Sequence, residues 1–103
     1  MRTAARVFRA LADPTRRQIL EELRGGGEVA AGEISRRFAI SAPSISRHLA
    51  ILKAAELVDE RRDGNRILYR LVPETLITSL NAYLSAVCLT QVRQRGKIAA
   101  RRV

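Results

Sequence analysis

The chain has 103 residues, 47% of them hydrophobic and 28% charged, which suits one domain with a small core and leaves little for a second. Its 19 Lys and Arg residues against 10 Asp and Glu residues give a net charge of +9, which favours a polyanionic partner such as DNA, RNA or an anionic membrane surface. One cysteine, Cys88, and one histidine, His48, exclude an intramolecular disulfide framework and a zinc site of the Cys/His type within one chain.

The basic residues are spread unevenly, although an excess of charge can also serve only to keep a surface soluble. All ten acidic residues lie in residues 1–74, whereas residues 75–103 hold five basic residues and no acid. The apolar runs are too short for a transmembrane helix, and the N-terminus lacks the apolar region of a signal peptide. We therefore expect a cytoplasmic protein with no membrane partner.

The first two segments have the patterns of short helices. In residues 2–11 the apolar side chains recur at i, i+1 and i+4, with arginines between them. Asp13 is a good N-cap, and Pro14 at the first helical position loses no hydrogen bond. The second helix should end at the three glycines of residues 25–27.

A pair of helices with a tight turn between them follows. Residues 28–38 predict a short helix, and Ser41 is a suitable N-cap for a longer one that carries Pro43 in its first turn and ends near Glu56. The side chains that would face the core recur at i, i+4 and i+7, and they are Ile45, Leu49 and Leu52.

The period of the pattern then changes from helical to alternating. Residues 57–71 contain two short runs on either side of Asp63-Gly64-Asn65, and Asp-Gly favours a β-hairpin turn. Three side chains of the second run should share one face, namely Ile67, Tyr69 and Leu71. Pro73 closes the hairpin and opens a last helix, whose apolar residues recur at spacings of 3, 4 and 3 in the manner of a helix–helix contact.

Two helices joined by a brief turn predict a helix-turn-helix, in which the second helix enters the major groove of double-stranded DNA. With the apolar stripe turned inward, the first turns of this helix present small residues, serine hydroxyls and an arginine, which suit a groove about 12 Å wide. The candidate DNA-binding residues on it are Ser41, Ala42, Pro43, Ser44, Ser46, Arg47 and His48. An ordinary solvated helix face with a serine cap is the alternative.

The hairpin strengthens this interpretation because its tip is rich in arginine. A basic hairpin can lie along the phosphate backbone or enter a narrow minor groove, although charge on an edge strand can also serve only to deter strand pairing. The candidate DNA-binding residues on the hairpin are Arg61, Arg62, Asn65 and Arg66.

Three segments in this order, residues 10–20, 32–58 and 61–71, resemble the ArsR/SmtB family of bacterial winged-helix repressors. The resemblance covers about residues 5–90 and is closest to a metal-independent branch of autorepressors. It implies a mainly α winged helix-turn-helix fold, with about five helices and a two-stranded antiparallel wing, in residues 1–92. Residues 93–103 would form a frayed basic tail.

The resemblance also implies a homodimer that forms through the first and last helices. The residues expected at this interface are apolar, and they are Val7, Phe8, Leu11, Ile77, Leu80, Leu84 and Val87.

Many family members sense metals, through a Cys-x-Cys pair before the turn or a His/Asp/Glu cluster on the last helix. The corresponding helices here have neither, because the last one offers only Glu74 and Cys88. Borderline and soft metals prefer imidazole or thiolate ligands, so we expect no metal and no other cofactor.

The two unique side chains, Cys88 and His48, each leave two interpretations open. Cys88 is either a small core residue or, on the two-fold axis of a dimer, one half of an intersubunit disulfide that acts as a redox switch. His48 either contacts a phosphate or packs beneath its helix, and its titration could make DNA affinity depend on pH.

The sequence thus predicts a dimeric transcriptional repressor that binds an inverted-repeat operator. A redox- or ligand-responsive sensor of the same fold, using Cys88, is the first alternative. A module whose basic face binds RNA or an acidic protein is the second. An enzyme is not expected, because the chain offers no nucleophile–base pair and no metal cluster.

Overall fold

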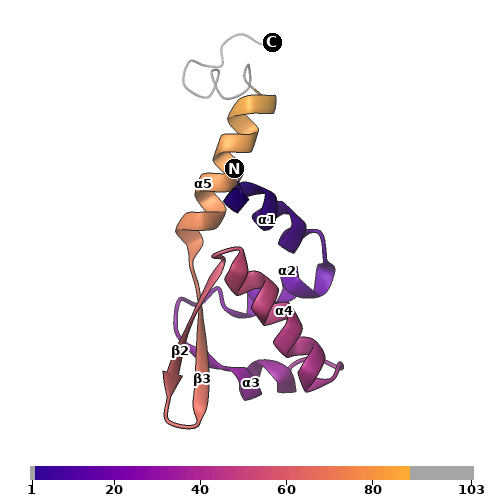
Figure 1. Cartoon of the computed structure of the whole chain (residues 1–103), viewed down its shortest axis with the longest axis vertical. Helices are drawn as coiled ribbons and strands as arrows, with labels where there is room; N and C mark the ends of the chain where they lie inside the picture. Colours follow the sequence, from indigo (N-terminus) through magenta and orange to yellow (C-terminus); the bar gives the residue numbers. More distant parts are fainter. Residues whose placement is uncertain (1, 89–103) are drawn as a thin grey trace.

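The computed structural model of the chain describes residues 2–88, and Figure 1 shows the arrangement of its elements. Residues 89–92 and the expected basic tail, 93–103, lie outside the described residues. The elements in chain order are α1 (Arg2–Leu11), α2 (Pro14–Glu22), β1 (Val29–Ala30), α3 (Ala31–Arg36), α4 (Ala42–Ala54), β2 (Val58–Asp63), β3 (Arg66–Leu71) and α5 (Pro73–Val87). This is the expected winged helix-turn-helix with five helices in the described part of the chain.

Helix starts follow the capping residues that the sequence offers. The Asp13 carboxylate accepts hydrogen bonds from the backbone N–H groups of Thr15 (2.7 Å) and Arg16 (3.2 Å) at the start of α2. Ser41 accepts from the Ser44 N–H (3.2 Å) at the start of α4. Each cap satisfies donors that have no partner inside the helix, so both helices begin where the sequence predicts.

The end of α4 has an unusual backbone feature. Glu56 has a φ of 62°, a left-handed conformation that glycine more often supplies. Its N–H donates to the Lys53 carbonyl (2.9 Å), and the Leu57 N–H donates to the Leu52 carbonyl (3.0 Å). This pair of bonds forms a Schellman motif, which turns the chain from α4 directly into the wing.

The sheet has three strands in the order β1-β3-β2, all antiparallel. The predicted two-stranded antiparallel wing is confirmed as the hairpin of β2 and β3, and β1 adds a third strand to the sheet that the sequence pattern did not predict. Val29 pairs with Tyr69 and Ala30 with Leu68, so the chain forms a short strand before α3 begins at Ala31. The backbone groups of Val29 and Ala30 thus pair with a strand that lies some forty residues further along the chain.

The turn of the hairpin consists of Gly64 and Asn65. Asp63 pairs with Arg66, which leaves these two residues as the connection between the strands. Gly64 has a φ of 64°, and glycine at the first central position is what a type II′ hairpin turn requires. The turn is therefore tight, and it holds Asn65 and Arg66 at the tip of the wing.

The core lies between the helices and the inner face of the sheet. Its buried side chains come from α1, α2, α3, α4, β2 and β3, with some from the connections between them, and β1 and α5 add only the partly buried Val29 and Leu76. The buried cluster contains Val7, Ala10, Ile19, Leu20, Leu23, Ile34, Ile45, Leu49, Leu52, Ala55, Leu57, Val58 and Tyr69. Partly buried Ile67 and Leu71 pack against it, so the predicted inner face of β3 is confirmed.

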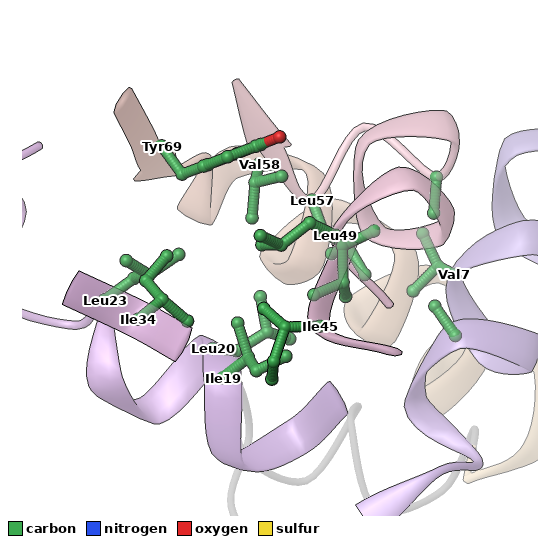
Figure 2. Packing of buried hydrophobic residues seen from close by; sticks show 13 residues of the cluster. Val7, Ile19, Leu20, Leu23, Ile34, Ile45, Leu49, Leu57, Val58 and Tyr69 are labelled. Atoms are coloured by element: carbon green, nitrogen blue, oxygen red, sulfur yellow. The ribbon is translucent and has the colours of Figure 1, made fainter. Parts of the chain in front are cut away.

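Figure 2 shows how α4 is held in the core. Ile45 lies beside Ile19 and Leu20 of α2, and Tyr69 of β3 and Val58 of β2 come in from the sheet. The predicted inward stripe of α4 is confirmed, because all three of its residues are at most 2% exposed. Burial of this stripe fixes which side of α4 faces solvent.

Helix α5 extends away from the wing, and α1 lies beside it (Figure 1). Phe8 of α1 and Tyr83 of α5 make an edge-to-face aromatic contact, with ring centroids 5.2 Å apart. No helix within residues 2–88 is long and apolar enough to cross a membrane.

Candidate nucleic-acid interface

The helix-turn-helix consists of α3, a turn over residues 37–41, and α4. Within α4 the first turns are accessible: Ser41, Ala42, Pro43, Ser46 and Arg47 are exposed, and Ser44 and His48 are partly buried. All seven residues that the sequence singles out on this helix therefore lie on one accessible end. We call these seven residues the reading face.

The start of the reading face is held by its own hydrogen bonds. The Ser41 hydroxyl donates to the Ser44 hydroxyl oxygen (3.1 Å), and Nη2 of Arg47 donates to the same oxygen (3.3 Å). Arg47 thus lies back toward the N-terminal end of the helix, with most of its five N–H donors still available. No acidic side chain lies within 4.0 Å of this guanidinium among residues 2–88.

His48 is held by an arginine that the sequence did not single out. Nη1 of Arg16 lies 3.4 Å from Nδ1 of His48. An arginine can only donate, so a hydrogen bond in this contact has Nδ1 as its acceptor. Arg16 itself donates to the Ala10 carbonyl (2.8 Å) and the Arg9 carbonyl (3.1 Å), and it lies 4.0 Å from Asp13. This arginine therefore links α1, α2 and the reading face.

On the wing, Arg61 is already engaged by an acid. Its Nε and Nη2 donate to the two oxygens of Glu28, at 2.8 and 2.7 Å. The same contact lowers the pKa of the Glu28 carboxyl, mainly through the hydrogen bond from Arg61. This bidentate ion pair connects the wing to the residue before β1, so fewer donors of Arg61 remain for a phosphate.

The remaining wing residues of the predicted site are exposed at or near the tip. Arg66 lies 3.6 Å from the Asp63 carboxylate, whereas Arg62 has no acid within 4.0 Å in the described part of the chain. Asn65 is exposed in the turn. In Figure 1 the wing tip and the N-terminal end of α4 lie at the same end of the molecule, with α3 between them.

A series of side-chain contacts joins the wing to α4. Nζ of Lys53 on α4 lies 3.0 Å from a carboxylate oxygen of Glu60 on β2, and Glu60 lies opposite Tyr69 of β3 in the sheet. The Lys53 hydrogen bond is the main reason why the pKa of Glu60 is lowered. Burial and the Glu60 contact together raise the pKa of Tyr69 to about 12. An ion pair therefore connects the wing to α4.

A second exposed surface is apolar and lies on α5. Ile77 is 56%, Leu84 44% and Val87 60% exposed, and Leu80 is partly exposed on the same stripe. Phe8 and Leu11 of α1 are partly buried. We call these six residues the apolar face. Exposed apolar residues that adjoin one another often mark an interaction site.

Val7 differs from the other residues that the family resemblance places at a dimer interface. Its side chain is 0% exposed and belongs to the core of the single chain. It leaves no surface for a partner, so a dimer contact would rest on the six residues of the apolar face.

Cys88 is partly buried at the C-terminal end of α5 and is a free thiol. Its two interpretations, a packing residue or half of an intersubunit disulfide, both stay predictions. Within residues 2–88 there is no group of three or more His, Cys, Asp or Glu side chains that could hold a metal ion.

Sequence reasoning missed three residues that organise this site: Arg16, Glu28 and Glu60. Two of them contact residues that are distant in the sequence. Arg16 and His48 are 32 residues apart, and Glu28 and Arg61 are 33 residues apart. The contact between Glu28 and Arg61 could have been predicted only if β1, which begins directly after Glu28, had been recognised as a strand of the same sheet.

Comparisons with known proteins agree with this architecture. A model described as a helix-turn-helix domain matches residues 11–61. The transcriptional repressor SdpR of Bacillus subtilis (strain 168) is 48% identical over 79% of this chain and 89% of its own. The solved ArsR family transcriptional regulator RHA00566 has a TM-score of 0.76 at 25% identity, over 93% of this chain and 94% of that one. An ArsR-like regulator from Rhodococcus sp. RHA1 has a TM-score of 0.74 at 32% identity, over 91% and 87%.

The order of elements, the exposed reading face and these relatives lead to one conclusion. The chain belongs to the ArsR/SmtB family of winged helix-turn-helix proteins and is a DNA-binding transcriptional regulator.

Proposed function

We propose that the protein represses transcription as a homodimer that binds an inverted-repeat operator. In a two-fold dimer the two α4 helices enter successive major grooves, so the half-sites should lie about one helical turn apart. The apolar face of α1 and α5 would form the contact between protomers. SdpR is itself a named repressor, which supports repression as the outcome of binding.

The observation that carries this proposal is the N-terminal half of α4. It is exposed and built of small residues, and Arg47 has no acid within 4.0 Å among residues 2–88. Small side chains let the helix approach base edges, and an arginine can pair bidentately with guanine O6 and N7. Such a contact specifies sequence, whereas the wing arginines would contact the backbone and supply affinity without specificity.

The direct test is selection of bound sequences from a random DNA library, followed by affinity measurements on the selected DNA. We expect an inverted repeat, and binding that weakens steeply with salt. Retention no better than that of random DNA at moderate salt would refute the proposal, and equal affinity for RNA would favour the RNA-binding alternative. A match of the selected sequence upstream of the protein's own gene would support autorepression.

Changing Arg47 to Ala should reduce operator affinity by about 1–3 kcal/mol for each base interaction that the substitution removes, and it should relax specificity at that position. Arg24→Ala is the matched control, because Arg24 is also an exposed arginine without an acid within 4.0 Å in residues 2–88, but lies on the turn after α2. Equal losses for the two variants would argue against base recognition by Arg47.

This function requires no catalysis, in keeping with a family of regulators, and we expect the protein to act in the cytoplasm. No small-molecule effector is needed for the proposed binding. If Cys88 forms a redox switch, oxidant should change the operator affinity of the wild-type protein and not that of Cys88→Ser.

A further inference from the structure

A small pocket outside the reading face is lined by three arginines. Arg6 and Arg9 come from α1 and Arg16 from α2, and the floor consists of Ile51 and Ala54 of α4. Its volume is about 270 Å³. We propose that this pocket is a second DNA contact, which binds a phosphate and the adjoining sugar of the operator backbone.

The charge of the pocket is largely uncompensated. Arg6 and Arg9 have no acid within 4.0 Å in the described residues, and Arg16 approaches only Asp13, at 4.0 Å. Three guanidinium groups around one cavity repel one another unless an anion lies between them. Arginine is also the side chain that best matches a phosphate, with which it can form two parallel hydrogen bonds.

Protein contacts order two of the arginines that line the pocket. Arg16 is only 13% exposed and donates to two carbonyls of α1, those of Ala10 and Arg9. Nη1 of Arg6 lies 3.5 Å from the Ala54 carbonyl near the end of α4. These contacts hold α1, α2 and α4 together around the cavity, so an anion entering it would require little reorganisation.

The position of the pocket selects DNA as the source of the phosphate. Arg47, Ile51 and Ala54 recur at i, i+4 and i+7 on α4, so the floor of the pocket continues the exposed stripe that begins at the reading face. Arg16 also contacts His48, a member of that face. If Arg47 lies in a major groove of the operator, the DNA sugar-phosphate backbone at the edge of that groove would therefore pass along the same side of α4.

The apolar floor fits the same occupant. Ile51 is an apolar side chain, yet it is 41% exposed among the three arginines of the pocket. A deoxyribose ring would cover this side chain while its phosphate meets the guanidinium groups, and an inorganic ion would leave it in water. The inference rests on the proposed function, because it takes operator DNA as the ligand.

The test uses the full chain with Arg6→Ala and Arg9→Ala made separately, and with Arg24→Ala as the charge-matched control. Arg16 is left intact because it holds two backbone carbonyls. Circular dichroism and sedimentation establish that each variant keeps its fold and its oligomeric state. We expect the slope of log affinity against log salt to decrease by about one for each phosphate that the variant no longer binds, counted over both protomers.

The loss of affinity should be the same factor on operator and on random DNA, because a phosphate contact carries no sequence information. Arg24→Ala should change the slope much less. If wild type binds its operator and the two α1 variants keep its slope, the inference is wrong and the proposed function stands. If wild type shows no preferred DNA sequence, the proposed function itself fails.

Neutral methylphosphonate linkages, placed one at a time along the operator, locate the contact. We expect some position where the neutral linkage weakens wild type but no longer weakens Arg9→Ala or Arg6→Ala. Absence of any such position would overturn the inference. The last experiment titrates inorganic phosphate at constant ionic strength, first into the protein alone and then into its complex with operator DNA. Tight saturable binding that shifts the resonances of Ile51 and displaces the operator would assign the pocket to a free anion instead.

Discussion

The reading face and the apolar face are both exposed, yet they differ in how the chain supports them. The reading face lies at the capped start of α4 and carries internal hydrogen bonds, and further along α4 Lys53 contacts Glu60 of the wing. In the apolar face Phe8 contacts Tyr83 and Leu11 packs against the core, whereas Ile77, Leu84 and Val87 are exposed on α5. Polar side chains are satisfied by water until DNA replaces it, whereas apolar side chains are stabilised only when a partner covers them. The two faces should therefore fail in different ways.

The largest effect is expected on the apolar face. Leu84→Glu places a charge at the centre of the proposed contact, so the dimer should dissociate while the single chain stays folded. Because the two half-sites are then bound independently, operator affinity should fall by about 10²- to 10⁴-fold. Sedimentation and DNA binding measure the two quantities.

Ala82→Glu is the control, since Ala82 is exposed on α5 but lies on the opposite side of the helix from Leu84. It should leave both the dimer and the operator affinity intact. A dimeric Leu84→Glu protein with unchanged DNA binding would show that the apolar face is not the interface.

Alkaline pH should lower the stability of the folded chain through Tyr69, which lies in the sheet opposite Glu60. The raised pKa of Tyr69, about 12, means that the folded chain favours the protonated phenol. This stabilisation is fully present below pH 10, the ordinary value, and is lost as pH rises through about 12. Two pKa units correspond to roughly 2–3 kcal/mol at most.

Chemical denaturation at a series of pH values measures this effect, with Tyr69→Phe and Tyr83→Phe compared. Tyr69→Phe should lose the part of the alkaline decline that Tyr69 causes, whereas Tyr83→Phe should retain it. Identical pH profiles for the two variants would assign the decline to other groups.

A smaller contrast is expected between two adjacent arginines of the wing. Arg62 has no acid within 4.0 Å in residues 2–88, whereas Arg61 is engaged by Glu28. Arg62→Ala should lower the salt dependence of DNA binding by about one for each phosphate that Arg62 binds in the wild-type protein. Arg61→Ala should change it less, and titration of binding against salt tests the difference. A larger change for Arg61 would mean that DNA displaces Glu28.

The smallest effect is expected on folding stability alone, with no change in DNA binding. Glu56 has a left-handed backbone, so Glu56→Gly should relieve strain and stabilise the fold by about 0.5–1 kcal/mol. The melting temperature should rise by a few degrees, and operator affinity should stay the same because Glu56 lies beyond the C-terminal end of α4. A lower melting temperature would show that the Glu56 side chain makes a contact more important than the backbone.

Much of the fold could be predicted because its signals are local. Ser41, Pro43 and the inward stripe of α4 define that helix within one segment, and Gly64 marks the hairpin turn. β1 was missed because two residues cannot show a period, and Val29 and Ala30 become a strand only by pairing with β3. The burial of Val7 was also missed, because Val7 and Phe8 are adjacent in one helix but point in different directions. Val7 enters the core, whereas Phe8 contacts Tyr83 of α5.

The sequence could predict which residues form the candidate site. It could not predict which of their side chains are already bound by other side chains of the same chain. All eleven predicted DNA-binding residues are exposed or partly exposed, as polar and small residues usually are. Which arginines are already engaged depends on long-range partners such as Glu28, and charge counting along the chain does not reveal them.

The hydrogen bond between Arg47 and Ser44 has a consequence for how DNA is searched. If Arg47 binds a base as proposed, the base pair must offer its guanidinium a better acceptor than Ser44 of the same helix. Over sequences that lack such an acceptor the side chain can remain on the protein, and only the non-specific backbone contacts hold the complex. In the proposed complex, Ser44 would therefore compete with the bases for the Arg47 guanidinium.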